Sequence, residues 1–167
     1  MSLLGRRVSL FLAAFLLSAP ALAREIVPYD GEAAPGTIVV RTEERRLYLV
    51  RSDGTAWRYP VGVGRAGKQW SGRARIEGKY VKPAWSPPDE VRRDNPRLPD
   101  IIPGGVSNNP MGARALTLDR DQYAIHGTNR PESIGKFVSY GCIRMHNADI
   151  IHLFDQVNVG TPVLVAR

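Results

Sequence analysis

The strongest constraint on the fold is a succession of short apolar or β-branched runs that are separated by turn residues. These runs cover residues 37–40, 46–50, 56–63, 72–81, 113–118, 122–125 and 161–166. Runs of this length, bounded by Gly, Pro, Asn and Asp, are typical of β-strands joined by turns. After residue 146 the apolar residues Ile150, Leu153, Phe154 and Val157 recur at helical spacing and would share one face of a helix. Asn147 is placed to cap the start of this helix, and Gly160 to follow its end. The pattern predicts a mostly β domain with one short α-helix.

The first 23 residues differ from the rest of the chain. Arg6 and Arg7 precede an apolar run over residues 8–19, and Ala21-Leu22-Ala23 is typical of a cleavage site. We interpret residues 1–23 as a secretory signal peptide that is cut near Ala23. The apolar run has about 12 residues and a membrane-spanning helix needs about 20, so a retained anchor is the alternative and no permanent anchor is expected. Residues 24–36 are expected to be a short leader into one domain over residues 37–167.

The composition is that of a basic globular protein. Hydrophobic residues make up 43% of the chain and charged residues 23%, with 23 Lys and Arg against 16 Asp and Glu. Removal of residues 1–23 would take away two basic residues and no acidic ones, so the exported protein would stay basic. Outside the cytoplasm, such a charge favours cell-wall polymers or anionic lipid surfaces. No basic run interleaved with aromatic residues is present, so nucleic acid is not an expected partner.

A long proline-rich connection occupies residues 82–110. Connections of this length are often functional, and Trp85 within it is a candidate for the wall of a substrate groove. The alternative for Trp85 is that it pins the loop to the core. Upstream, Gly62, Gly64 and Gly67 do not precede a helical pattern, so we expect turns there and no phosphate site.

The chain holds a single cysteine, Cys142. In an exported protein an unpaired thiol needs a reason, and nucleophilic reactivity is the leading one, although a buried inert cysteine is the alternative. A thiol nucleophile needs a base, and His126 at the end of the 122–125 run is the candidate. Ser139 or a nearby backbone carbonyl would orient the imidazole ring, and the helix that follows Cys142 would favour its thiolate.

The residues next to Cys142 complete this candidate site. Gly141 allows a tight turn, so the backbone amides of Gly141 and Cys142 are expected to form an oxyanion hole. Arg144 is a candidate for binding a substrate carboxylate, with an internal ion pair as the alternative. His126, Cys142 and His146 could in principle bind zinc, but their spacing is not that of a zinc site and no metal or cofactor is expected. His152 is placed on the solvent side of the helix and outside the site.

The central stretch resembles the L,D-transpeptidases with the YkuD-type catalytic domain. The family signature is a histidine-glycine pair followed by Ser-His-Gly-Cys-Ile/Val-Arg, and the chain has His126-Gly127-Thr128 and then Ser139-Tyr140-Gly141-Cys142-Ile143-Arg144-Met145. The resemblance extends to residues 103–105, 109–112, 147–150 and 160–163, so it covers about residues 36–166. It implies a single-domain, β-sandwich or barrel-like fold over residues 37–167.

The resemblance also implies a function, namely two-step acyl transfer on peptidoglycan. Cys142 would attack the carbonyl of the third stem-peptide residue, typically meso-diaminopimelate, and expel the terminal D-alanine; the side-chain amine of a second stem would then form a 3→3 cross-link. Family members also use water, free D-amino acids or the lysine of an outer-membrane-anchored protein as acceptor. Gly127, Thr128 and Tyr140 are the further substrate-binding candidates. Carbapenem acylation and a periplasmic, wall-associated location are expected on the same grounds.

Two departures from the family pattern stand near the site. Tyr140 replaces the histidine that the family most often has, and Trp70-Ser71-Gly72-Arg73-Ala74 replaces the usual Thr-Pro-x-Gly turn. Two alternatives to transfer remain open: an L,D-carboxypeptidase or amidase that hydrolyses the same bond, and an inactive wall-binding protein.

Overall fold

The computed structural model describes residues 24–167. The predicted signal peptide over residues 1–23 and its cleavage site lie outside this range and stay predictions. The strands are β1 (Glu25–Pro28), β2 (Ile38–Arg41), β3 (Arg46–Val50), β4 (Thr55–Pro60), β5 (Val63–Gly64), β6 (Gly72–Val81), β7 (Arg114–Leu118), β8 (Ala124–His126), β9 (Phe137–Ser139), β10 (Ile143–Arg144) and β11 (Pro162–Ala166). The helices are α1 (Asp89–Asp94), the 3₁₀ turn η1 (Pro131–Ser133) and α2 (Asn147–Gln156).

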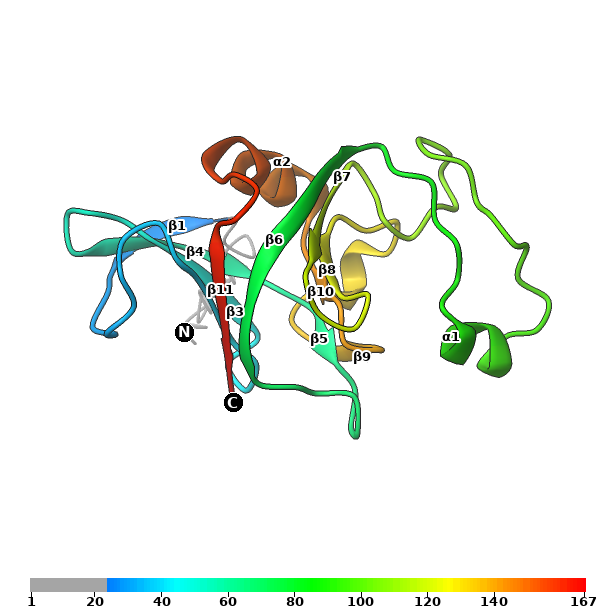
Figure 1. Ribbon diagram of the computed structural model, residues 1–167, viewed down its shortest axis with the longest axis horizontal. Coiled ribbons are helices and arrows are strands. Elements are labelled where there is room, and N and C mark those ends of the chain that lie inside the picture. Colours follow the sequence, from blue (N-terminus) through cyan, green and yellow to red (C-terminus); the bar gives the residue numbers. More distant parts are fainter. Residues whose placement is uncertain (1–23) are drawn as a thin grey trace, which may run out of the picture.

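Nine strands form one curved sheet in the order β1-β4-β3-β2-β11-β6-β7-β8-β10, and β5 pairs with β9 in a separate two-stranded ladder (Figure 1). The long strand β6 belongs to both halves of the sheet, because its first residues pair with β11 and its later residues pair with β7. The register shifts between Ile76 and Gly78, and irregularities of this kind bend a strand. β6 therefore turns the sheet around a shared interior, as the resemblance implied for a sandwich or barrel-like fold.

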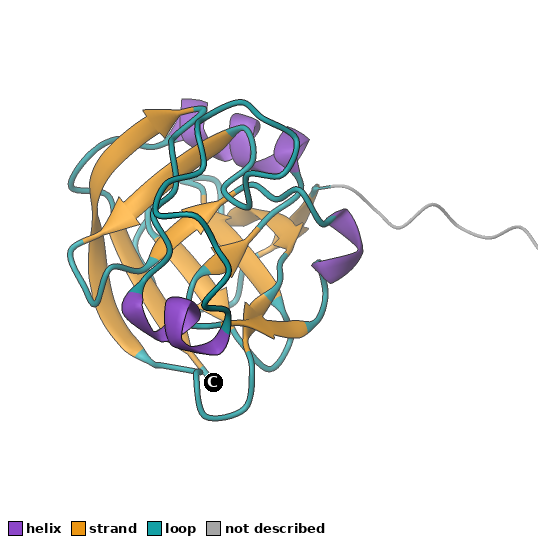
Figure 2. Cartoon of the chain, turned by 90° about the vertical axis from the view of Figure 1, so that its right-hand side faces the viewer, coloured by secondary structure: helices purple, strands orange, loops and turns teal. Residues whose placement is uncertain are grey.

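The main core fills this interior. It contains Ile38, Val40 and Leu47 from the first half of the sheet, Leu116, Ile125 and Ile143 from the second half, and Ile150 and Leu153 from α2. The helix packs against β7 and against β8, the strand that ends in His126. The helices lie around the outside of the strands (Figure 2). The predicted apolar stripe of the helix is thus what fixes it over the half of the sheet that carries the candidate site.

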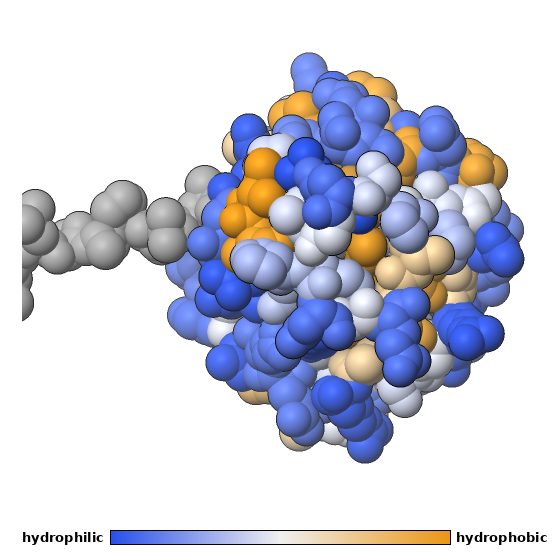
Figure 3. Space-filling model, turned by 90° about the vertical axis from the view of Figure 1, so that its left-hand side faces the viewer, coloured by the Kyte–Doolittle hydropathy of each residue, from blue (hydrophilic) through white to orange (hydrophobic). Residues whose placement is uncertain are grey.

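A smaller apolar cluster lies on the outer face of the first half of the sheet. Val39, Tyr48, Val50 and Ala56 are buried there beneath Val27, Tyr29 and Ala33 of the N-terminal segment. The face of the molecule near this segment is mostly hydrophilic, with small separate apolar areas (Figure 3). Part of the expected leader is therefore a strand of the sheet, β1, which pairs antiparallel with β4.

Other sequence expectations need correction. The run 56–63 is not one strand, because β4 ends at Pro60 and β5 begins at Val63. Asp121 and Gln122 have positive φ angles of 49° and 57°, so β8 starts only at Ala124. The connection 82–110 contains the helix α1. No helix in residues 24–167 is long and apolar enough to cross a membrane.

The helix α2 begins where it was expected but is not capped as expected. His146 is the N-cap residue, and no side chain caps this end. The amide of Asn147 instead accepts hydrogen bonds from the backbone N–H groups of Ala113 (3.0 Å) and Thr128 (3.2 Å) and donates one to the Thr128 carbonyl (3.0 Å). Asn147 therefore fixes the loop that follows His126.

Candidate active site

The turn that carries Cys142 lies between β9 and β10 and is closed by Ser139. The Ser139 hydroxyl donates a hydrogen bond to the Cys142 carbonyl (2.6 Å) and accepts one from the Gly141 amide (3.1 Å). Gly141 has a φ of 129°, and a Cβ atom there would collide with the ring of Tyr123. Glycine is therefore required at 141 for two reasons, the backbone conformation and the close approach of an aromatic ring.

Two aromatic residues support this turn from the side. The indole nitrogen of Trp70 donates a hydrogen bond to the Gly141 carbonyl (2.9 Å), and the Trp70 ring is stacked on Tyr123 with centroids 5.2 Å apart. Trp70 is almost fully buried and belongs to the main core cluster. Trp70 and Tyr123 were not predicted as site residues, although the altered 70–74 segment was the available signal for Trp70.

His126 is buried as the last residue of β8, and the backbone orients its imidazole ring. Nδ1 lies 2.7 Å from the Gly127 carbonyl oxygen. A carbonyl can only accept, so Nδ1 carries the hydrogen and Nε2 is left with its lone pair. Of the two groups proposed to orient the ring, the backbone carbonyl does so; Ser139 holds the nucleophile turn and does not contact the imidazole through any hydrogen bond found in residues 24–167.

Strand pairing places the nucleophile turn next to the strand that ends in His126. β8 and β10 are parallel, with Ile143 opposite Ile125 and Arg144 opposite His126. Cys142 immediately precedes β10, and the residue as a whole is partly exposed. Within residues 24–167 no hydrogen bond joins this sulfur to the imidazole, and catalytic hydrogen bonds are often long before a substrate is bound.

Burial keeps both groups neutral at pH 7. Desolvation, with a smaller contribution from the charge of Arg144, lowers the pKa of His126 to about 4, against the hydrogen bond to the Gly127 carbonyl. Desolvation also raises the pKa of the Cys142 thiol, and a hydrogen bond to the Ala124 backbone and the charge of Arg144 offset only part of this shift. The expectation that the helix favours the thiolate is not met, because α2 begins only at Asn147, beyond β10.

Arg144 carries a guanidinium without a carboxylate partner. No acidic side chain among residues 24–167 lies within ion-pair distance of it. Desolvation lowers its pKa, yet an arginine stays protonated at neutral pH. Of the two roles considered for Arg144, the internal ion pair is therefore not formed.

The remaining predicted residues make mainly internal contacts. The Gly141 amide is already bonded to Ser139, which leaves the Cys142 amide as the candidate oxyanion donor of the predicted pair. Thr128 is buried and its hydroxyl accepts from the Arg130 amide (2.9 Å). The carbonyl of Gly127 is bonded to His126, and Trp85 forms a two-residue bridge with Ile102 that closes the 82–110 segment.

Two of the three histidines lie away from the nucleophile. His152 does not face solvent freely, because its Nδ1 lies 2.9 Å from the hydroxyl of the fully buried Tyr59 and its ring packs edge-on against Trp57. His146 lines a separate hollow of about 350 Å³ with Arg46 and Arg58. No group of three or more potential metal ligands is found in residues 24–167.

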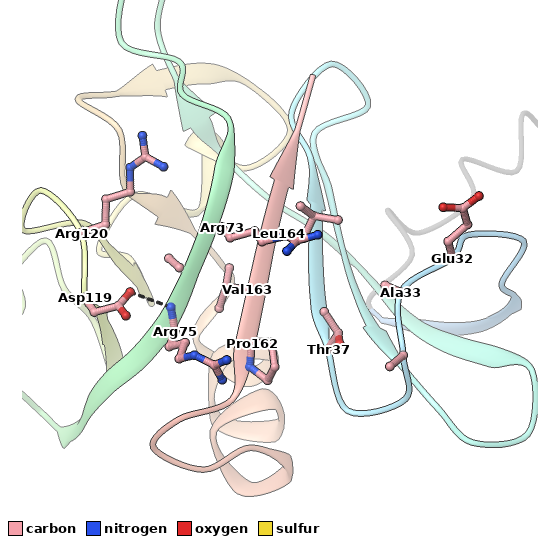
Figure 4. A pocket seen from close by; sticks show the side chains of 12 residues that line it. Glu32, Ala33, Thr37, Arg73, Arg75, Asp119, Arg120, Pro162, Val163 and Leu164 are labelled. Carbon is pink, nitrogen blue, oxygen red and sulfur yellow. Dashed lines mark hydrogen bonds between the residues drawn. The ribbon is translucent and has the colours of Figure 1, made fainter.

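A hollow of about 570 Å³ lies away from the cysteine. It lies over β6 and β11 and beside residues 32–37, with Arg73, Arg75 and Leu164 among its lining residues (Figure 4). None of the predicted site residues lines it. This hollow is therefore separate from the candidate site.

A mostly β domain that presents a cysteine beside a neutral, oriented histidine is typical of enzymes with a thiol nucleophile. Residues 35–165 match the family described as the L,D-transpeptidase catalytic domain, YkuD. The chain belongs to this family, and both the resemblance and the implied fold are confirmed.

A curated relative is described as a member of the same class of enzyme. The chain is 42% identical over 137 residues to the probable L,D-transpeptidase ErfK/SrfK of Escherichia coli K12, covering 77% of this chain and 43% of that protein. The chain thus spans less than half the length of this relative.

Solved structures share the fold. A Brucella melitensis protein described as a probable carnitine operon oxidoreductase is 39% identical, with a TM-score of 0.58, covering 89% of this chain and 96% of that one. L,D-transpeptidase 3 of Mycobacterium tuberculosis, solved with a faropenem-derived adduct, is 16% identical with a TM-score of 0.60, covering 78% of this chain and 60% of that one. At that identity the second likeness concerns the fold alone.

Proposed function

We propose that the chain is an L,D-transpeptidase that acts on peptidoglycan stem peptides through a thioester on Cys142. The observation that carries the proposal is the arrangement of two adjacent strands. Cys142 directly precedes β10, and the paired strand β8 ends in His126, a neutral histidine whose Nδ1 is held by a carbonyl. Family membership and the transpeptidase relative support the same activity.

The first step would form the thioester. Cys142 and His126 both rest in their neutral forms, so the thiol must lose its proton to Nε2 of His126 as the sulfur attacks the carbonyl of the third stem residue. The C–N bond to the terminal D-alanine then breaks, and the proton on His126 passes to the leaving amine. The imidazole is neutral again when the thioester has formed.

Two further groups would assist this step. The Cys142 amide is placed to donate to the developing oxyanion, since the turn is held rigid by Ser139 and Trp70. The unpaired guanidinium of Arg144 would attract a carboxylate of the stem peptide. A partly buried positive charge gains more from an anionic substrate than a fully exposed one does.

The second step would transfer the acyl group to an acceptor. An amine of a second stem, water, a free D-amino acid or the lysine of an outer-membrane-anchored protein would attack the thioester carbonyl while His126 takes the proton of the acceptor. The C–S bond then breaks, and the proton passes from His126 to the Cys142 sulfur, which restores the neutral pair. We place this reaction in the periplasm, on the basis of the predicted signal peptide.

The test is incubation of purified protein with tetrapeptide muropeptides, followed by mass analysis of the products. Cross-linked dimers support transfer, whereas trimmed tripeptides alone would assign hydrolysis. The Cys142→Ala variant should yield neither product, because the thioester can no longer form. Unchanged muropeptides with the wild-type protein would count against an enzyme and for a wall-binding role.

A further inference from the structure

The helix α1 lies beside the nucleophile turn but is not held there by apolar packing. None of its residues is buried. Its contacts with the rest of the domain include an ion pair between Glu90 and Lys68 and two contacts of Asp94. Exposed polar contacts of this kind each contribute little, so α1 is a weakly attached part of the domain.

Asp94 joins α1 to the nucleophile turn through one carboxylate oxygen. The Tyr140 hydroxyl donates to Oδ2 at 2.5 Å, and Nη2 of Arg65 donates to the same atom at 2.9 Å. The Arg65 guanidinium also lies over the Tyr140 ring, 4.0 Å from its centroid. Tyr140, Arg65 and Asp94 therefore form one cluster, named here the tyrosine cluster.

The members of this cluster differ in how firmly they are held. Tyr140 follows Ser139, whose hydroxyl closes the nucleophile turn, and Cys142 is two residues further on. The backbone amide of Arg65 donates to the Ser139 carbonyl at 2.9 Å, so Arg65 is fixed to the same turn. Asp94 is the only member on the weakly attached α1, which makes α1 the part that can move.

The tyrosine cluster thus occupies the site where the sequence departs from the family pattern. The hydrogen bonds from Tyr140 and Arg65 lower the pKa of the Asp94 carboxyl, so this group is ionised at neutral pH and accepts both donors. Trp85 and Ile102 close the same 82–110 segment further from the turn. Loss of the Tyr140 hydroxyl would remove one of the few contacts that hold α1, without disturbing the fold of the core.

We propose that Tyr140 is a positioning residue, which with Arg65 holds Asp94 and thereby α1 beside Cys142 as one wall of the donor-peptide groove. This inference rests on the proposed transpeptidase function. It predicts that the cluster acts on substrate binding and not on the chemistry of the thiol, because neither Tyr140 nor Asp94 contacts Cys142 or His126 through a hydrogen bond in residues 24–167.

The first measurement is steady-state kinetics with a tetrapeptide donor. Tyr140→Phe and Asp94→Asn should each raise KM for the donor about 3- to 10-fold while kcat stays within about twofold, because one polar contact is lost. The double variant should be no worse than Asp94→Asn alone, since both changes break the same contact. Unchanged KM, or a loss confined to kcat, would overturn the inference.

The second measurement needs no activity. Trypsin should cut at Arg92 and Arg93 of α1 about 3- to 10-fold faster in both variants, because the helix is free of the turn for more of the time. Tyr80→Phe and Asp155→Asn, exposed residues on β6 and α2, are the matched controls and should behave as wild type. Wild-type cleavage rates in Tyr140→Phe and Asp94→Asn would refute the positioning role.

The two measurements separate the two proposals. If the wild-type protein shows no turnover but the variants are cut faster, the proposed function fails and the cluster still positions α1. If turnover is present and neither KM nor cleavage changes, the positioning role alone fails.

Discussion

At the scale of single residues, the site depends on hydrogen bonds between side chains and the backbone. The Gly127 carbonyl holds Nδ1 of His126, and the carbonyl and amide of the nucleophile turn are bound by Ser139. Such contacts leave little freedom in the imidazole ring or in the backbone of the nucleophile turn before a substrate arrives. Preorganisation of this kind lowers the cost of reaching the transition state.

The depressed pKa of His126 predicts how stability depends on pH. The pKa is about 4 in the folded chain against an ordinary 6.5, so between these values the unfolded chain binds more protons and stability falls as the pH falls. The full loss would be about 3 kcal/mol. Urea unfolding from pH 7 to pH 4 measures it, and His126→Gln should show a shallower decline. An equal decline in both proteins would mean that His126 is not the cause.

At the scale of elements, the 82–110 segment is organised by one buried side chain as well as by α1. The Asn109 amide nitrogen lies 2.9 Å from the Pro83 carbonyl, 3.2 Å from that of Ile102 and 2.9 Å from that of Pro103. Its oxygen accepts from the Met111 amide at 2.8 Å. The segment is thus an ordered loop in spite of its many prolines.

Asn109→Ala should loosen this segment. The variant leaves the partly buried carbonyls of Pro83 and Pro103 without this donor, which costs about 1–3 kcal/mol. We expect a lower midpoint of urea unfolding and faster tryptic cleavage between residues 82 and 110. Asn108→Ala, at an exposed neighbouring position, is the matched control. Equal stability of the two variants would show that Asn109 does not hold the loop.

At the scale of the whole molecule, the sequence predicts the strands and the main helix because their apolar periodicity is local. The runs 46–50 and 72–81 are strands with those same limits. The two ends of β6 pair with different neighbours, and this pairing depends on contacts far apart in the chain. Periodicity alone therefore does not reveal the curvature of the sheet.

The candidate site also has a part that the sequence predicts and a part that depends on tertiary contacts. The motif around Cys142 and His126 is local, so the sequence alone identifies these two residues. The roles of Trp70, Tyr123 and Asp94 depend on tertiary contacts. His152 was placed in solvent by its position on the helix, but Tyr59 reaches it from the distant strand β4. Tyr140 could be recognised as a departure, while its partner, 46 residues away, could not.

The central claim is that Cys142 is a nucleophile activated within this domain, and intact mass after exposure to a carbapenem tests it most directly. Imipenem should add one covalent adduct to the wild-type protein, and none to Cys142→Ala. A wild-type protein that keeps its mass, or an adduct that persists in Cys142→Ala, would contradict the account.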